Sequence, residues 1–468
     1  MRHPFLKLIF LVPFLFGVSF IKAQIPRPDF EINYLTEFQN KKNEVLQTFL
    51  YSDATGHYAL FAGGKYGDGK KTIRKFDFNF QPTNYRMKLE YPKKTSAPTD
   101  IGFLSSGKQF YHFWQVKSRE GIHHFVQEID LSTQAKKDVK KIATIDYVNG
   151  YSTSTESRVL QDDSKQMYLA TEILADRQES VTLRIDSFDE NLRPETTFSY
   201  NLPHPKWQFK VLSIHPYQDN SFILIGKNHF SENIVKSEKR KEYEYHIYEL
   251  KNGEAHLLKT ISPNNFHING LKSILKDNHL IIAGFLNEHD ILKPSAIYAM
   301  RYNVLLAEVE FEKSTRLPDS FYNYPEIRDQ KIAAIHVGFR NKKKDADRNY
   351  VLKELYTSDN NDLLIVAEQN FINENNVPIT NGQGMLIPSI GTKTFYSNDI
   401  TVLKVDKEGN LMWNSKIIKR QQWGGNPSIL SYFPVFKNNK LFLFYNGNYL
   451  NLENSGSNFI DKNDAALI

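Results

Sequence analysis

The stretch Leu271-Lys-Ser-Ile-Leu-Lys-Asp-Asn-His-Leu-Ile-Ile-Ala-Gly284 decides the fold of this 468-residue chain. Two apolar runs flank Asp277-Asn278, and the second run is almost continuously apolar. Asp and Asn favour tight turns, because their side chains bond to nearby backbone and they tolerate positive φ. The pattern therefore predicts a β-hairpin whose second strand is packed on both faces.

The second apolar run of this hairpin is one of seven similar copies. The copies are Tyr58–Gly63, Phe110–Trp114, Met167–Thr171, Phe222–Gly226, Leu280–Gly284, Leu363–Glu368 and Leu441–Tyr445. Their first residues are 52, 57, 55, 58, 83 and 78 residues apart. A period of about 40 to 60 residues with several strands per unit is typical of a β-propeller.

A second hairpin follows the first in most units. Its clearest copy is Ile400-Thr-Val-Leu-Lys-Val-Asp-Lys-Glu-Gly-Asn-Leu-Met-Trp413, in which Gly409 can take positive φ in the turn. The third strand often has an acidic residue at or near its end, as at Asp77, Asp130, Asp186, Glu249 and Asp406. Two hairpins give four strands per unit. We therefore predict one all-β propeller domain over residues 24–468, with seven four-stranded blades favoured and six or eight as alternatives.

The two ends of the chain carry separate signals. A basic start, the apolar run Leu8–Phe20 and the small residue Ala23 predict a secretory signal peptide over residues 1–23. An uncleaved N-terminal anchor is the alternative. At the other end, Asp464–Ile468 matches Asp399–Leu403, so the sequence stops inside a third strand. We favour closure of the ring by an N-terminal strand near Phe30–Phe38 over a truncated sequence, because a missing strand would expose a sheet edge.

Composition limits the function classes. Cleavage after Ala23 leaves 56 basic residues against 53 acidic ones, scattered along the chain, so we expect no nucleic-acid partner. No later stretch reaches 18 uninterrupted apolar residues, and we expect no membrane span in the mature chain. The absence of cysteine excludes disulfides, thiol catalysis and cysteine-ligated metals. The expected location is the periplasm, the cell surface or the medium.

No catalytic or metal motif stands out, and we expect no cofactor. The 14 histidines form no His-Glu-x-x-His motif, and the adjacent pair His123-His124 should point to opposite faces of a strand. His112 is interpreted as a packed residue rather than a ligand. Glu172, Asp176 and Glu368 follow apolar strands and could line one mouth of the ring, although solvated loop carboxylates are the favoured interpretation.

The segment Asp399–Gln422 resembles the repeat of quinoprotein-type propellers, in which an Asp-x-x-x-Gly-x-x-x-Trp pattern closes each blade. This copy is one residue shorter between Asp406 and Gly409, and Trp413 is interpreted as a blade-packing residue rather than a mark of quinone binding. The longer stretch Leu352–Asn446 is similar to uncharacterised secreted propeller-like proteins of Gram-negative bacteria, a resemblance that implies no particular activity.

The two long steps between units mark insertions, one between Asn303 and Tyr350 and the other over Gln369–Ser397. Long loops in a compact fold are commonly functional. We expect a binding or scaffold protein that holds an envelope protein or a glycan at one mouth of the ring. The candidate ligand-binding residues are Asn381, Gln383, Tyr396 and Trp423. A polysaccharide hydrolase or lyase is the alternative.

Overall fold

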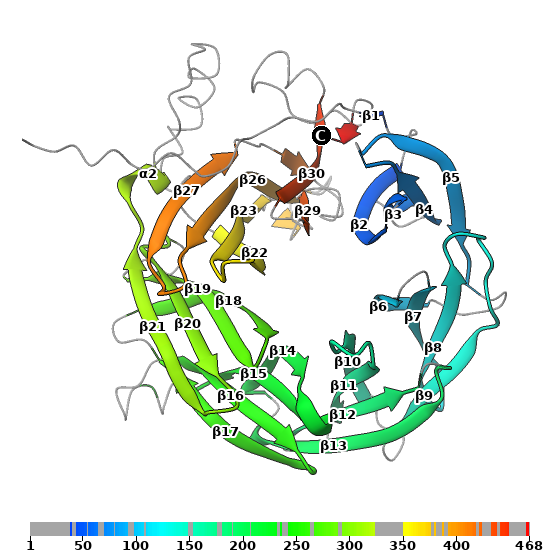
Figure 1. The fold of residues 1–468 in the computed structure, drawn as a ribbon, viewed down its shortest axis with the longest axis horizontal. Coiled ribbons are helices and arrows are strands. Elements are labelled where there is room, and N and C mark those ends of the chain that lie inside the picture. Colours follow the sequence, from blue (N-terminus) through cyan, green and yellow to red (C-terminus); the bar gives the residue numbers. More distant parts are fainter. Residues whose placement is uncertain are drawn as a thin grey trace, which may run out of the picture.

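The computed structural model is a ring of antiparallel β-sheets, a β-propeller (Figure 1). The structure describes residues 38–39, 44–53, 55–63, 70–78, 80–91, 98–106, 109–147, 153–175, 180–189, 191–205, 207–231, 235, 242–262, 266–288, 293–322, 350–375, 379–380, 386–387, 392–417, 421–423, 432–437, 440–448 and 465–467. The signal peptide predicted over residues 1–23 lies outside these ranges. In the described part of the chain, no helix has the length and apolar character needed to cross a membrane.

Six sheets of the ring have four strands and one has five. Blade 1 consists of β2 (Glu44–Asp53), β3 (Gly56–Gly63), β4 (Lys71–Phe76) and β5 (Pro82–Leu89). Blade 2 consists of β6 (Thr99–Ser106), β7 (Gln109–Lys117), β8 (Gly121–Asp130) and β9 (Lys140–Asp146). Blade 3 consists of β10 (Thr153–Gln161), β11 (Met167–Ala175), β12 (Ser180–Phe188) and β13 (Pro194–Pro205). Blade 4 consists of β14 (Phe209–Pro216), β15 (Phe222–His229), β16 (Tyr243–Lys251) and β17 (Glu254–Ile261), with the 3₁₀ turn η2 (Gln218–Asn220).

The remaining blades depart more from the repeat. Blade 5 consists of β18 (His267–Lys276), β19 (His279–Asn287), β20 (Ala296–Asn303) and β21 (Glu308–Arg316), followed by the short helix α2 (Asp319–Tyr322). Blade 6 consists of β22 (Tyr350–Thr357), β23 (Leu363–Asn375), β26 (Thr392–Val405) and β27 (Leu411–Ile417), with β28 (Gln421–Trp423) paired to β26. A two-stranded sheet, β24 (Ile379–Thr380) with β25 (Leu386–Ile387), accompanies it. Blade 7 consists of β29 (Tyr432–Lys437), β30 (Lys440–Asn448), β31 (Ala465–Leu467) and β1 (Phe38–Gln39).

The ring closes by pairing the two ends of the described chain. β31 pairs with β30, placing Leu467 opposite Asn446, and β1 pairs with β31, placing Phe38 opposite Leu467. The last blade therefore takes three strands from one end of the chain and its outer strand from the other (Figure 1). The predicted closure by an N-terminal strand is confirmed, although the strand is Phe38–Gln39 and shares only Phe38 with the predicted segment Phe30–Phe38.

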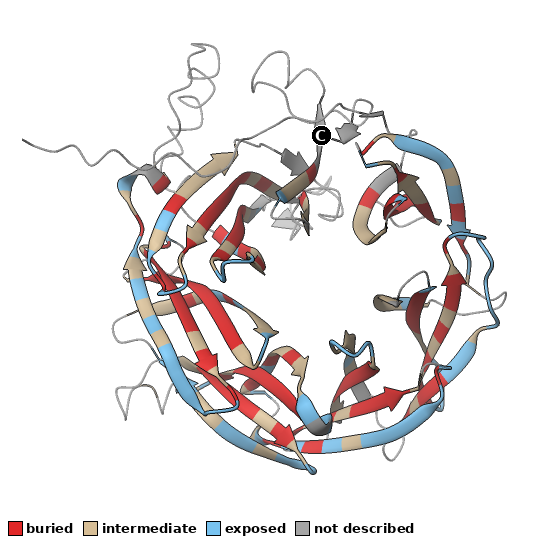
Figure 2. Cartoon of the chain, viewed as in Figure 1, coloured by how far each residue is buried: buried red, intermediate tan, exposed pale blue. Residues whose placement is uncertain are grey.

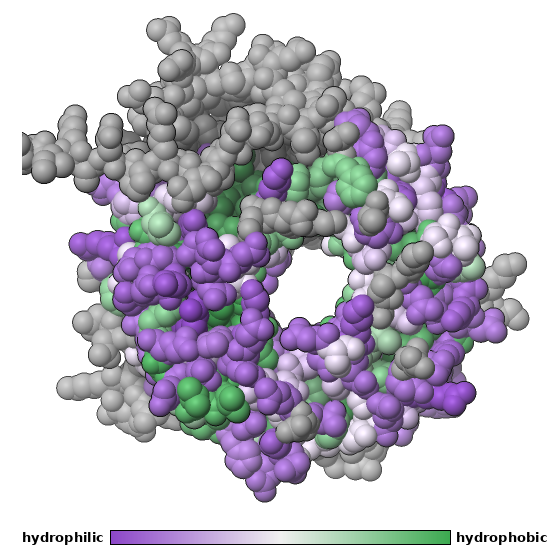
Figure 3. Space-filling view, in the orientation of Figure 1, coloured by the Kyte–Doolittle hydropathy of each residue, from purple (hydrophilic) through white to green (hydrophobic). Residues whose placement is uncertain are grey.

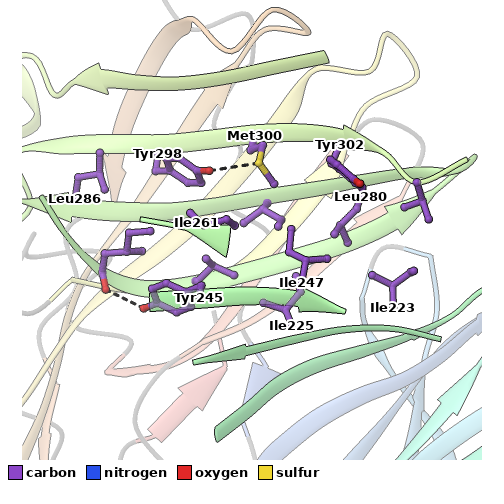
Figure 4. Close-up of a cluster of buried hydrophobic side chains, with 14 of the residues drawn as sticks. Ile223, Ile225, Tyr245, Ile247, Ile261, Leu280, Leu286, Tyr298, Met300 and Tyr302 are labelled. Carbon is purple, nitrogen blue, oxygen red and sulfur yellow. Dashed lines mark hydrogen bonds between the residues drawn. The ribbon is translucent and has the colours of Figure 1, made fainter. Parts of the chain in front are cut away.

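The hydrophobic core lies between neighbouring blades. Ile225 of β15 and Ile282 of β19 are fully buried in the same cluster, together with Tyr245 and Tyr298 (Figure 4). The hydroxyl of Tyr245 donates to the carbonyl of Ile268 at 2.9 Å, which fastens blade 4 to the first strand of blade 5. Second strands are buried and outer strands are largely exposed (Figure 2), as the continuous apolar runs predicted.

Aspartates close the tight turns between strands. The Asp406 carboxylate accepts hydrogen bonds from the backbone N–H groups of Glu408 at 3.0 Å and Asn410 at 2.7 Å, and Gly409 has a φ of 87°. In blade 3 the turn is closed by Asp189. Asp186 lies buried near the end of the third strand β12, as expected for the acidic residue of that strand.

Blade 6 corrects one of the two predicted insertions. The stretch Gln369–Ser397 was predicted to be a long loop, but β23 continues to Asn375 and β26 starts at Thr392, and these two residues pair. Both ends of this insertion therefore form a lengthened hairpin. The described part of the stretch Asp345–Tyr356 is the strand β22, as expected, and not a helix.

Candidate functional site

The four ligand-binding residues predicted from the sequence are only partly described. Asn381 and Gln383 lie outside the described residues. Tyr396 lies half-buried on β26, paired with Gln422 of β28, and the backbone of Trp423 pairs with that of Phe395. The structure thus places Tyr396 and Trp423 on neighbouring strands, where β28 pairs with the lengthened part of the hairpin.

A different set of residues lines a cavity of about 420 Å³ at the centre of the ring. Its walls come from the first strands of four successive blades, β10, β14, β18 and β22. The polar residues that line it are Glu156, Arg158, Lys210, Ser213, Lys272, Ser273 and Glu354. Figure 3 shows that the centre of the ring is open and that hydrophilic residues surround much of its rim. We call this cavity the channel site.

Blade 3 supplies the first charged group of the channel site. Arg158 Nη2 contacts Oε1 of Glu172 and lies 3.3 Å from Oε1 of Glu156, while its Nη1 donates to the carbonyl of Leu212 at 3.2 Å. Glu156 and Glu172 lie directly opposite each other on β10 and β11. Burial raises the pKa of Glu172 to about 7, and Glu156 adds to this rise while Arg158 opposes it.

The favoured interpretation of two carboxylates as solvated loop residues was wrong. Glu172 is 6% exposed and lies within β11, and Glu368 is fully buried within β23. Lys353 Nζ lies 3.6 Å from Oε2 of Glu368. Both glutamates therefore lie buried on second strands, Glu172 beside Arg158 and Glu368 beside Lys353. Asp176 lies outside the described residues.

β-bulges shape the inner strands of the channel site. The pairing of β14 with β15 skips Leu212, and the pairing of β22 with β23 skips Lys353. A bulged residue leaves the regular ladder and re-aims its neighbours. Here it leaves the carbonyl of Leu212 able to accept from Arg158, which links blade 3 to blade 4.

Blades 4 and 5 supply two exposed cations, Lys210 and Lys272, which make no hydrogen bond or ion pair with any other described residue. On the same two strands, Ser213 Oγ lies 2.7 Å from Ser273 Oγ, and His215 Nε2 lies 2.8 Å from the same Ser273 oxygen. These bonds hold β14 against β18. The two lysines therefore lie on strands that hydrogen bonds connect to each other.

Blade 6 supplies an acidic group on the far side of the two lysines. Burial raises the pKa of Glu354, and the charges of Lys272 and Lys353 act against this rise. Cations therefore occupy the middle of the wall, with Lys210 and Lys272 on blades 4 and 5. Carboxylates lie on either side of them, Glu156 beside Arg158 on blade 3 and Glu354 on blade 6.

This arrangement can bind a polar ligand, and it offers carboxyl groups for proton transfer. The lysines can donate to an anionic group, and the glutamates can accept from hydroxyl or amine donors. Among the described residues, no group of three or more His, Asp or Glu could hold a metal ion.

Sequence reasoning missed most of the channel site. Lys210, Lys272 and Glu354 occur in first strands that read as ordinary alternating segments. The available signal was a charged residue at a corresponding place in several first strands. It was weak, because a charge on a strand next to solvent is common.

Two of the described histidines are packed at contacts between strands. His112 is 3% exposed, and its Nε2 lies 2.8 Å from Oδ1 of Asp100, a carboxylate that also contacts Lys71 and Tyr91. His124 is fully buried, with its Nε2 3.0 Å from Ser157 Oγ, whereas its neighbour His123 faces the other way. The predictions of a packed His112 and of opposite faces for the His123-His124 pair are confirmed.

Comparisons with known proteins find similar folds alone. No family model and no curated protein matches this chain. Among solved structures, the polysaccharide lyase Uly1 is similar at 10% identity and a TM-score of 0.47, with 95% of this chain and 93% of that chain covered. A prolyl endopeptidase is similar at 10% identity and a TM-score of 0.39, with 86% of this chain and 54% of that chain covered. A GH43 endo-arabinanase from Bacillus licheniformis is similar at 12% identity and a TM-score of 0.29, with 56% of this chain and 96% of that chain covered.

This chain thus spans about half the length of the prolyl endopeptidase that it matches. At such identities the similarity concerns the arrangement of strands and carries no argument about activity. The chain is a β-propeller whose ring is closed by the pairing of β1 with β31.

Proposed function

We propose that this protein is an exported binding protein whose ligand occupies the channel site. The observation that carries the proposal is the convergence of charged side chains from four blades on one cavity of about 420 Å³. Cavities of this size are at the small end of the range that holds small-molecule ligands. Export rests on the signal peptide predicted from residues 1–23, and it places the ligand outside the cytoplasm.

The position of the cavity supports this proposal. Lys210 lies at the start of β14, and Glu172 lies near the end of β11, so both lie toward the side of the ring where first strands begin and second strands end. The lengthened hairpin of β23 and β26 projects from the same side. A ligand in the channel site could therefore also reach Tyr396 and its neighbours on that hairpin.

Ligand capture tests the proposal. The mature chain is screened against a glycan array and against envelope extracts, next to Lys210→Trp, which places a large ring in the cavity, and to Lys88→Trp, which changes an exposed lysine of the outer strand β5. We expect a ligand that the wild type and the Lys88 variant bind and that the Lys210 variant does not. Equal binding by all three proteins would place the ligand elsewhere and refute the proposal.

A polysaccharide hydrolase or lyase is a second candidate, favoured by Glu172. A carboxyl group with a pKa of about 7 beside a ligand cavity is suited to transfer a proton near neutral pH. Incubation with a panel of neutral and acidic polysaccharides, followed by measurement of reducing ends and of unsaturated products, tests it. This candidate requires an activity that Glu172→Gln abolishes. The absence of any product from the panel would count against this candidate.

A further inference from the structure

The charge pattern of the channel site indicates the chemistry of its ligand, and the inference rests on the binding function proposed above. We propose that the ligand is an acidic oligosaccharide, whose carboxylate binds to Lys210 and Lys272 and whose hydroxyl groups bind to Glu156 and Glu354.

The cations of the channel site differ in how far they are already neutralised. Arg158 is committed to Glu172, to Glu156 and to a backbone carbonyl. Lys210 and Lys272, in contrast, line the cavity without a hydrogen-bond or ion-pair partner in the part of the chain that the structure describes. Two such ammonium groups on adjacent inner strands attract an anionic group, and a carboxylate can accept from both.

The strands that carry these two lysines are held together before any ligand arrives. The Ser213–Ser273 contact of 2.7 Å and the His215–Ser273 contact of 2.8 Å connect β14 to β18 across the blade junction. A site whose strands are already fixed loses less conformational freedom when it binds. The two lysine stems are therefore presented together, although each side chain keeps its own rotamers.

Carboxylates stand on both sides of the lysine pair. Glu156 lies on blade 3 and Glu354 on blade 6, and both line the same cavity. Carboxylates repel an anion but accept hydrogen bonds from hydroxyl groups. A sugar acid carries a carboxylate and several hydroxyls on one ring, so a single ring can satisfy cations and carboxylates that lie close together.

Titration calorimetry with a matched pair of ligands tests the inference. The probes are an oligogalacturonate of defined length and its fully methyl-esterified form, which keeps the hydroxyls and lacks the charge. We expect the acid form to bind the wild type about tenfold more tightly than the ester, because hydrogen bonds between charged partners are roughly twice as strong as neutral ones. The Lys210→Ala, Lys272→Ala double variant should lose this preference, while Lys88→Ala should keep it. Glu354→Gln should weaken the ester, whose hydroxyl groups lose a charged acceptor and which gains nothing from the removal of a negative charge.

Each other outcome overturns a defined part of the reasoning. If acid and ester bind equally and Lys210→Trp blocks both, the channel binds saccharide without an anion site, and the inference fails while the proposed function stands. If an oligoglutamate of equal charge binds as tightly as the oligogalacturonate, the site recognises charge alone, and the proposal of a saccharide ligand is refuted. If neither probe binds and no ligand captured by the wild type is lost in Lys210→Trp, both the inference and the proposed function fail. Unchanged thermal unfolding of each variant confirms that the loss is not a loss of fold.

Discussion

Acid should lower the free energy of unfolding of this propeller through His124. This residue is buried between blades 2 and 3, where a protonated imidazole would lose its contact with water. Its side chain is fully buried, Nε2 contacts Ser157, and Nδ1 has no hydrogen-bond partner among the described residues. Burial lowers the pKa of His124 from 6.5 to about 4, although the negative charge of Asp186 acts in the opposite direction. Between these two values the unfolded chain binds a proton that the folded chain does not, so stability falls as the pH falls.

The size of this effect follows from the two pKa values. Going from about pH 7.5 to about pH 5, preferential protonation of His124 in the unfolded state should lower the free energy of unfolding by about 2 kcal/mol. Glu172 works the other way, because its folded-state pKa of about 7 lies above the ordinary 4.5 and the folded chain takes up the proton first. The informative quantity is therefore the difference between wild type and variant, rather than the total pH dependence of either.

The variant His124→Gln keeps a polar group for Ser157 and cannot titrate. Urea unfolding at both pH values should show that the variant loses about 2 kcal/mol less than the wild type on acidification. His256→Gln is the matched control, because His256 is an exposed residue with 56% of its side chain accessible. Equal losses in wild type and His124→Gln would show that His124 accepts a proton in the folded ring, and would refute the argument from burial.

Three further predictions concern stability. Asp100→Asn should lower the free energy of unfolding by about 3 kcal/mol, because it removes a carboxylate that Lys71, His112 and Tyr91 all contact, while the exposed Asp138→Asn should change it little; urea unfolding of both compares them. Lys165→Gly should raise the thermal midpoint, because the exposed Lys165 has a φ of 69° and relief of that strain contributes about 0.5 kcal/mol. Gly409→Ala should lower the thermal midpoint, because alanine is strained at the positive φ of Gly409. Thermal melts that shift in the reverse directions would contradict the turn assignment. Ile282→Ala should cost about 3 kcal/mol in urea unfolding, because Ile282 is fully buried between blades 4 and 5, and a cost below about 1 kcal/mol would show that the junction collapses around the cavity.

Local sequence was enough to predict the hairpins and their order. The segment Leu271–Gly284 forms β18 and β19, with the turn at Asp277-Asn278 where two consecutive residues take positive φ, at 47° and 63°. Such features depend on neighbours along the chain, through turn chemistry and the alternation of side chains on a strand. Trp413, expected to pack within its blade, is likewise 5% exposed in a core cluster.

Features that depend on contacts between distant residues were harder to predict. The favoured interpretation of Glu172 and Glu368 as solvated was wrong, because their burial depends on the blades at either side. The stretch Gln369–Ser397 was predicted to be a loop since its Pro and Gly residues interrupt the strand pattern, yet β23 and β26 continue into it as a hairpin. Asp186 lies near the end of a third strand as expected, but its partners, Arg184 on the same strand and Thr197 on β13, could be identified only from the structure.

The sequence by itself determined a repeated two-hairpin unit and the absence of disulfides. These follow from periodicity, composition and turn residues, each of which is legible within a few positions of the chain. Only the tertiary structure decided where the charged residues of the first strands meet. Glu156, Lys210, Lys272 and Glu354 come from four blades and lie far apart in the chain. They share one cavity because ring closure turns every first strand toward a common axis, and no local pattern records that convergence.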